Sequence, residues 1–166
     1  ITVSLLISNL RSHVNAERLL ARNDHLTGIA NSRSFFEYAN RTFQNIKKFK
    51  YNITIIYIDL DNFKQVNDSM GHKTGDRLLQ TVAMCIKNNI RQTDLAARIG
   101  GDEFAVIIPG IDEHRSEEIT ELMQQSLLDE MKKNEWPVTF SIGLAIFKNS
   151  SMSINEMIQR ADELMY

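Results

Sequence analysis

The pattern of hydrophobic and polar positions divides the chain into strands and amphipathic helices. Residues 51–58 are apolar on both faces, which predicts a buried central strand. Two more apolar runs, 95–99 and 104–108, flank Gly100 and Gly101 and predict a tight β-hairpin whose turn glycines adopt positive φ. The remaining spacing predicts four longer helices and one further strand, namely helices 32–49, 76–90, 112–133 and 154–166 and strand 138–147.

Two details of packing follow from the same pattern. Leu122 falls on the predicted inner face of helix 112–133. Gly71 and Gly75 predict a turn that carries His72 and precedes the next helix.

The first 23 residues contain neither Gly nor Pro and predict one helix, apolar at its start and polar afterwards. Its apolar part is shorter than the about 20 residues needed to span a bilayer. Three interpretations stay open: the end of a membrane helix, a coiled-coil connector from an upstream sensor, or a helix packed on the domain. We favour a connector that pairs with a second copy. The predicted organisation is this connector, 1–23, followed by one domain, 24–166.

Composition limits the classes of function. The 166 residues carry a formal net charge of -2, which suits one α/β domain and gives no support for a nucleic-acid-binding surface. The only cysteine, Cys85, cannot form an internal disulfide, and its apolar helical surroundings predict a core position. The chain begins with Ile1 rather than Met, which predicts that it is part of a longer protein.

Carboxylates follow both the predicted central strand and the hairpin turn. Asp59 comes directly after residues 51–58, and Asp102 and Glu103 come directly after the two glycines. If the hairpin pairs beside the central strand, these acids converge and can hold Mg²⁺, which prefers oxygen ligands and is usually completed by phosphates. Lys64 is near enough in sequence to supply positive charge to those phosphates. Ordinary turn and helix-start acids are the alternative, but the combination favours a metal–nucleotide site for phosphoryl transfer.

Five stretches, in order along the chain, resemble one protein family. Residues 100–104 spell GGDEF, the signature that gives the GGDEF family of bacterial diguanylate cyclases its name. Four other stretches resemble the opening motif, the substrate-binding motif, the closing strand and the last helix of that family: DHLTGIANSRSF (24–35), DLDNFKQVNDSMGHKTGD (59–76), FSIGLA (140–145) and ADELMY (161–166). The resemblance implies an α/β (α+β) fold, with a central, mostly antiparallel sheet flanked by helices, of the palm-like nucleotidyl cyclase type.

The resemblance also implies a reaction and the residues that perform it. Members of the family condense two GTP molecules into cyclic di-GMP and release pyrophosphate. Asp59 and Asp102 would bind Mg²⁺ or Mn²⁺, with the Leu60 carbonyl as a further ligand and Glu103 close by. Asp102 would accept the proton of the attacking ribose 3′-hydroxyl, and Lys64 would stabilise charge on the phosphates. The residues that the resemblance assigns to catalysis are therefore Asp102, Lys64 and Glu103.

By the same resemblance, the nucleotide itself would be bound by neighbouring positions. Asn67 and Asp76 would read guanine, since a carboxylate accepts from guanine N1–H and N2–H but repels the unprotonated N1 of adenine. His72 would help to line the site, and the two turn glycines would let the backbone approach the nucleotide. The expected GTP-binding residues are Phe63, Asn67, His72, Asp76, Gly100 and Gly101.

Arg91 and Asp94 match the RxxD inhibitory site of the family, nine residues before Gly100. There they would bind cyclic di-GMP and slow the enzyme, because arginine pairs well with phosphates and with the guanine edge. Two departures from the family pattern stand out. Ser32 replaces a usual Arg, and the sequence stops at Tyr166, where relatives continue with a Lys and an Arg that contact phosphates. This predicts a truncated domain end with weaker GTP binding or turnover.

The resemblance implies partners as well. Each domain holds one GTP, so catalysis needs two domains face to face, and a homodimer through residues 1–23 is expected. A cytoplasmic domain of a larger protein with an upstream sensor is implied, and the apolar start leaves an inner-membrane anchor open. The main alternative is a catalytically silent module that binds GTP or cyclic di-GMP as a receptor. The intact acids and lysine favour the enzyme, and the guanine-reading pair disfavours a cyclase for other purines.

Overall fold

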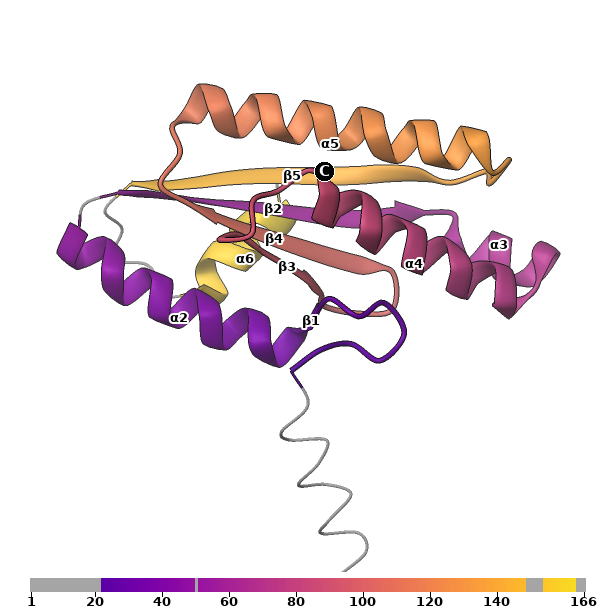
Figure 1. The fold of residues 1–166 in the computed structure, drawn as a ribbon, viewed down its shortest axis with the longest axis horizontal. Coiled ribbons are helices and arrows are strands. Elements are labelled where there is room, and N and C mark those ends of the chain that lie inside the picture. The colour runs from indigo at the N-terminus through magenta and orange to yellow at the C-terminus, as the bar shows by residue number, and fades with distance from the viewer. Residues whose placement is uncertain (1–21, 50, 149–153, 164–166) are drawn as a thin grey trace, which may run out of the picture.

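The computed structural model describes residues 22–49, 51–148 and 154–163 (Figure 1). Their elements, in chain order, are β1 (Ala30–Asn31), α2 (Ser32–Phe49), β2 (Asn52–Asp61), α3 (Phe63–Met70), α4 (His72–Asn88), β3 (Leu95–Arg98), β4 (Glu103–Pro109), α5 (Glu113–Lys133), β5 (Thr139–Lys148) and α6 (Ile154–Glu163). The predicted connector lies outside the described residues apart from its last two. Of these, Asn23 forms an isolated bridge with Ala30, so the prediction of helix as far as Asn23 is wrong.

One five-stranded sheet, in the order β1-β3-β4-β2-β5, organises the domain. β2 is central, paired antiparallel with β4 on one side and with β5 on the other. β3 and β4 form the predicted antiparallel hairpin, and the short β1 pairs parallel with β3. The predicted mostly antiparallel sheet is confirmed, and the β1–β3 pair is its parallel part.

Helices cover the two faces of the sheet, with α2 and α5 on opposite sides (Figure 1). Because side chains alternate along a strand, β2 contributes to a core on each face. Ile53 and Ile55 pack in the core that includes Phe35 of α2, while Ile56 and Ile58 pack in the core of α4 and α5. All five of these side chains are fully buried. The predicted buried central strand is thereby confirmed.

Two details differ from the sequence prediction. α4 begins at His72 rather than Asp76, because Gly75 lies inside the helix and its missing side chain makes room for Asn67 of α3. A Cβ on Gly75 would lie 2.0 Å from the Asn67 Oδ1 atom. Leu122, predicted on the inner face of α5, is 54% exposed, since the helix turns its buried stripe toward the sheet through other residues.

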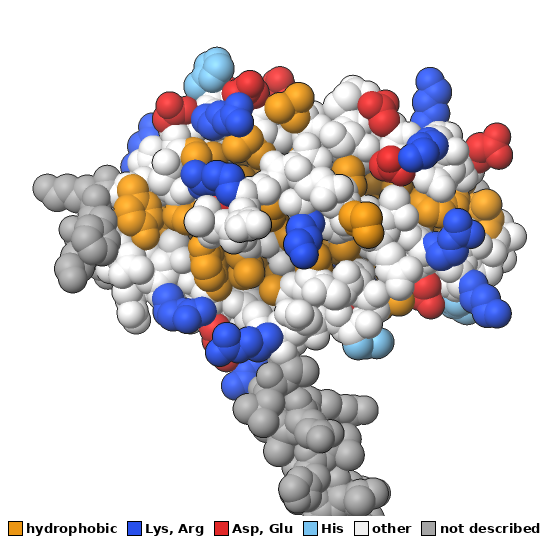
Figure 2. Space-filling model, in the orientation of Figure 1, with side chains coloured by type: hydrophobic (Ala, Val, Ile, Leu, Met, Phe, Trp, Pro, Cys, Tyr) orange, Lys and Arg blue, Asp and Glu red, His pale blue; other side chains and the backbone are white. Residues whose placement is uncertain are grey.

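The surface carries charge of both signs. Figure 2 shows Lys and Arg side chains interspersed with Asp and Glu on one face, so that no single sign covers it. Among the residues that the structure describes, no helix has the length and apolar character needed to cross a membrane.

Candidate active site

Strand pairing brings the predicted acids together. In the β2–β4 ladder, Asp59 lies directly opposite Glu103, and the Leu60 N–H donates to the Asp102 carbonyl at 3.3 Å. Asp59 and Asp61 stand two residues apart on β2 and so project from the same face of the sheet as Ile53 and Ile55. The acids therefore occupy the end of that face, where the apolar core gives way to polar side chains.

The pKa of the Asp59 carboxyl group is raised where these acids come together. Burial raises its pKa above the ordinary value, and the neighbouring charges of Asp102, Glu103 and Asp61 raise the pKa further. Three neighbouring carboxylates thus act on the Asp59 carboxyl group. Such repulsion is costly in the free protein and is relieved by a bound cation.

The donor set suits a hard divalent cation that keeps part of its water shell. In the described part of the chain, no group of three or more His, Cys, Asp or Glu side chains is placed to hold a metal ion by itself. Mg²⁺ is usually held by one or two carboxylates, with waters and substrate phosphates completing its octahedron. The Asp59 and Asp102 carboxylates with the Leu60 carbonyl fit that mode, and the raised pKa of Asp59 marks the excess negative charge that a cation would neutralise.

The turn glycines act differently from the prediction. The loop between β3 and β4 has four residues, 99–102, and neither Gly100 nor Gly101 adopts positive φ. The Ile99 N–H donates to the Glu103 carbonyl at 2.8 Å, so the longer loop reverses the chain without a left-handed residue. Space is what Gly100 provides, because a Cβ there would lie 2.2 Å from the Glu103 Oε2 atom. A Cβ added to Gly101 would meet nothing within 4 Å.

A residue that the sequence reasoning missed holds this loop in place. The Arg98 Nη2 atom donates to the Gly101 carbonyl at 2.7 Å, and its Nε atom donates to the Gly100 carbonyl at 3.1 Å. The Nη1 atom of Arg98 pairs with Asp24 at 3.2 Å, and both side chains are largely buried. Burial alone would raise the pKa of Asp24, but hydrogen bonds from Thr27 and the Arg98 guanidinium outweigh it and lower that pKa. Arg98 therefore ties the loop before Asp102 to the loop that opens the domain.

The nucleotide-binding candidates lie on α3 and α4. Asn67 is half-buried, and Asn67 and Phe63 both lie beside Gly75. Lys64, His72 and Asp76 are exposed. Within the described ranges, no hydrogen bond or ion pair joins these three side chains to the acids of β2 and β4. The structure thus brings the acids together, while the lysine and the guanine-reading pair stand on the adjoining helices.

The Arg91–Asp94 loop lies at the other end of the hairpin. The Arg91 Nη2 atom contacts Asp94 Oδ1 at 2.7 Å and the Pro109 carbonyl at 2.9 Å. The Asp94 side chain is 1% exposed and also accepts from the Arg91 backbone N–H. The hydrogen bonds that the Arg91 guanidinium donates to the Asp94 carboxylate are the main reason why the pKa of Arg91 is raised. A cavity of about 300 Å³ adjoins both residues.

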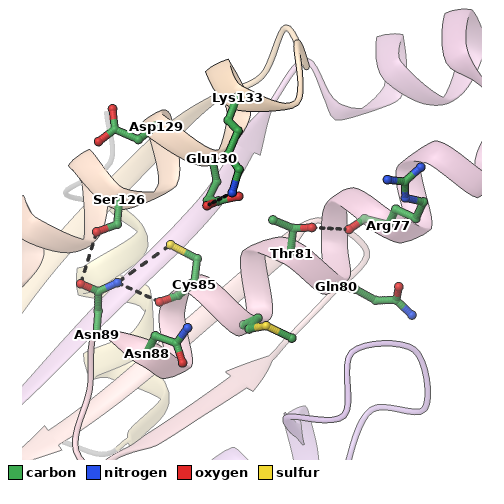
Figure 3. Close-up of a pocket in the computed structure, with 11 residues that line it drawn as sticks. Arg77, Gln80, Thr81, Cys85, Asn88, Asn89, Ser126, Asp129, Glu130 and Lys133 are labelled. Atoms are coloured by element: carbon green, nitrogen blue, oxygen red, sulfur yellow. Dashed lines mark hydrogen bonds and ion pairs between the residues drawn. The ribbon is translucent and has the colours of Figure 1, made fainter.

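A larger hollow, of about 750 Å³, lies between α4 and α5 (Figure 3). None of the predicted site residues lines it. Polar groups at its floor bond to each other, since the Asn89 Nδ2 atom donates to the Cys85 carbonyl at 2.8 Å. Burial raises the pKa of the Cys85 thiol to about 11, so the thiol is not a reactive group there. We therefore base the active site on the acids and not on this hollow.

Comparison with known proteins finds similar sequences along nearly the whole chain. The family model described as "Diguanylate cyclase, GGDEF domain" matches residues 21–166. The chain is 32% identical over 167 residues to the probable diguanylate cyclase DgcT of Escherichia coli, covering 98% of this chain and 36% of that protein. It is 31% identical over 166 residues to the cyclic di-GMP phosphodiesterase NbdA of Pseudomonas aeruginosa, covering 96% of this chain and 21% of that protein. The chain spans less than half the length of these curated relatives.

A solved structure agrees in fold. The coiled coil and GGDEF domain of DgcB from Caulobacter crescentus, in complex with c-di-GMP, superimposes with a TM-score of 0.79 at 27% identity. The match covers 98% of this chain and 88% of that one.

Proposed function

Because the chain belongs to the GGDEF domain family of diguanylate cyclases, we propose that it condenses two GTP molecules into cyclic di-GMP. The observation that carries the proposal is the gathering of Asp59, Asp102 and Glu103 at one end of β2 and β4. Like charges held together on a rigid sheet are suited to a divalent cation and to the phosphates that accompany it.

The proposed chemistry forms one phosphodiester bond at a time. The ribose 3′-oxygen of one GTP attacks the α-phosphorus of the other, the bond from that phosphorus to the bridging oxygen breaks, and pyrophosphate leaves. Asp102 accepts the proton of the 3′-hydroxyl, and a second turn of the same step closes the ring. Mg²⁺ or Mn²⁺, when bound, would neutralise the charge that develops on the phosphates.

The chain's own residues orient the substrate. Asp59, Asp102 and the Leu60 carbonyl would hold the cation, with Glu103 beside them. Lys64 would supply positive charge to the phosphates from the first turn of α3. Asn67 and Asp76 would read the guanine edge, and both stand where α3 packs on α4.

The proposed organisation has two domains face to face, each with one GTP. Residues 1–23 would join two copies and connect them to an upstream sensor, and residues 24–166 would form the cyclase domain. The site belongs in the cytoplasm, where GTP is available, and a membrane anchor would belong to the longer protein. Arg91 and Asp94 would bind cyclic di-GMP and inhibit, which the cavity of about 300 Å³ beside them supports.

A silent receptor that binds GTP or cyclic di-GMP is the second candidate. The ion-paired Arg91–Asp94 loop with its cavity favours a ligand site that works independently of turnover. The intact acids and Lys64 favour the enzyme, since a receptor has no use for repelling carboxylates.

Product analysis separates the two candidates. The full-length protein, held as a forced dimer, would be incubated with GTP and Mg²⁺ and in parallel with ATP and Mg²⁺. We expect cyclic di-GMP and pyrophosphate from GTP, and no cyclic product from ATP. No cyclic di-GMP together with retained binding of labelled cyclic di-GMP would contradict the enzyme and establish the receptor.

A further inference from the structure

The Asp61 carboxylate is fastened to β5 by two hydroxyl groups. The Thr139 Oγ1 atom donates to Asp61 Oδ2 at 2.8 Å, and the Ser141 Oγ atom donates to Asp61 Oδ1 at 2.8 Å. Both oxygens of the carboxylate are therefore directed toward β5. We call these three residues the Asp61 clasp.

The clasp lies where β2 has lost one of its two neighbours. The β2–β4 ladder ends at the pair of Asp59 with Glu103, whereas the β2–β5 ladder continues to the pair of Asp61 with Thr139. Ser141 is paired with Asp59 in that ladder, yet its hydroxyl donates to Asp61. The last two residues of β2 thus depend chiefly on β5, and the clasp reinforces that edge.

The clasp is followed at once by a strained turn and a helix. Asn62 has φ 64, a left-handed conformation that is uncommon outside glycine, although asparagine adopts it more often than most residues. α3 starts at the next residue, and the Gln65 N–H donates to the Asn62 carbonyl at 3.0 Å. Val66 anchors α3 in the core with no exposed surface. Strain of this kind persists only where the surroundings fix the backbone on both sides, here the clasp and Val66.

We propose that Asp61 is a positioning residue that aims α3 at the acids. By fixing the last residue of β2, the clasp fixes the turn at Asn62 and hence the direction in which α3 presents Lys64 and Asn67. This inference rests on the proposed function, which assigns substrate-binding roles to Lys64 and Asn67 of α3. Displacing a substrate-holding group by about 1 Å can lower a rate about 100-fold. Loss of the two hydrogen bonds of the clasp would therefore be enough to impair the site if it let α3 shift by that distance.

Paired substitutions separate the clasp from the charge of Asp61. Asp61→Asn removes the charge but keeps both bonds, since its oxygen accepts from one hydroxyl while its N–H₂ donates to the other. Asp61→Ala removes both bonds. Thr139→Val with Ser141→Ala removes them from the other side and keeps the charge, and Thr139→Ser is the matched control.

Two measurements report on positioning. For a GTP analogue with a non-hydrolysable α–β bridge, in the presence of Mg²⁺, we expect affinity to fall about tenfold in Asp61→Ala and in the double variant. Affinity should stay within about twofold of the unaltered protein in Asp61→Asn and Thr139→Ser. Amide hydrogen exchange of α3 without nucleotide should be faster in Asp61→Ala and in the double variant. It should be unchanged in Asp61→Asn and in Thr139→Ser.

The outcomes are distinct. A loss of nucleotide affinity in Asp61→Asn equal to that in Asp61→Ala would overturn the proposal in favour of a charge or metal-ligand role. Unchanged exchange of α3 in Asp61→Ala would overturn it as well, whatever happens to the nucleotide. If the unaltered protein forms no cyclic di-GMP, the proposed function fails, but faster exchange in α3 still upholds the clasp.

Discussion

At the tip of the β3–β4 hairpin, carboxylates face one another, and the pKa of Asp59 is raised by burial and by its acidic neighbours. At the base of the same hairpin, the Asp94 carboxylate is buried in contact with Arg91, which also donates to the Pro109 carbonyl. The ends of β4 are about 20 Å apart at about 3.3 Å per residue. One end holds uncompensated negative charge, and the other holds a compensated pair.

Under the proposed function, this difference would let one hairpin serve two ligands. The tip is costly in the free protein and gains from a cation and phosphates, so its acids are expected to lower stability and raise activity. The base already has the partner that its carboxylate needs, so a ligand there must exchange one set of hydrogen bonds for another. A change at the tip should alter chemistry first, and a change at the base should alter stability and regulation first.

Asp102→Ala tests the tip most strongly. We expect the rate of cyclic di-GMP formation to fall roughly 1,000-fold, because a proton acceptor and a metal ligand are lost together. Thermal unfolding should be unchanged or slightly higher, since one repelling charge is gone. Rates are measured by chromatography of the product, with the exposed Glu117→Ala of α5 as the control. Normal turnover in Asp102→Ala would show that the assigned role is wrong.

Arg91→Ala tests the base. The buried Asp94 would lose its guanidinium partner, so we expect the free energy of unfolding to fall by about 1–2 kcal/mol. Added cyclic di-GMP should then no longer slow turnover. Arg115→Ala is the matched control, because the Arg115–Glu118 pair has the same i,i+3 spacing but is half-exposed on both sides and should cost under about 0.5 kcal/mol. Equal costs in urea unfolding would remove the contrast between a buried and an exposed pair.

The two turn glycines offer a finer test of the tip. Gly100→Ala would push the flexible end of Glu103 aside, since the new Cβ would lie 2.2 Å from Glu103 Oε2. We expect roughly a tenfold loss of turnover with little change in stability. Gly101→Ala meets nothing within 4 Å and should leave turnover nearly unchanged. Equal losses in both variants would mean that backbone freedom, and not space beside Glu103, is what the glycines provide.

The Asp24–Arg98 pair links the tip to the start of the domain and gives a pH dependence. Because the folded pKa of Asp24 is lowered from 3.8, its contribution is complete above that pH and is lost as pH falls through the lower, folded value. Asp24→Asn should therefore be less stable by about 1 kcal/mol at pH 6. The difference should shrink below pH about 3.8, as urea unfolding across that range would measure. A difference that is constant with pH would exclude the ion pair as its cause.

Much of this site was predictable because its acids directly follow a strand and a hairpin turn that the sequence pattern identifies clearly. Residues 53–58 of β2 are apolar except for Thr54, and the hairpin strands flank a Gly-Gly step. The pairing of β2 with β4 brings Asp59 to Glu103. Arg98 was missed because its role depends on two loop carbonyls and on Asp24, 74 positions away. The start of α4 was misjudged because Gly75 reads as a turn signal, whereas tertiary packing against Asn67 uses its lack of a side chain.

The most direct test of the contrast between tip and base is titration with Mn²⁺ followed by calorimetry. The full-length protein should bind Mn²⁺ and unfold at a higher temperature in its presence, because the cation relieves the repulsion around Asp59. Asp59→Asn should weaken binding at least about tenfold and raise the unfolding temperature of the metal-free protein slightly. Arg91→Ala should leave Mn²⁺ affinity unchanged. Equal Mn²⁺ affinity in Asp59→Asn and the unaltered protein would contradict a metal site at the hairpin tip.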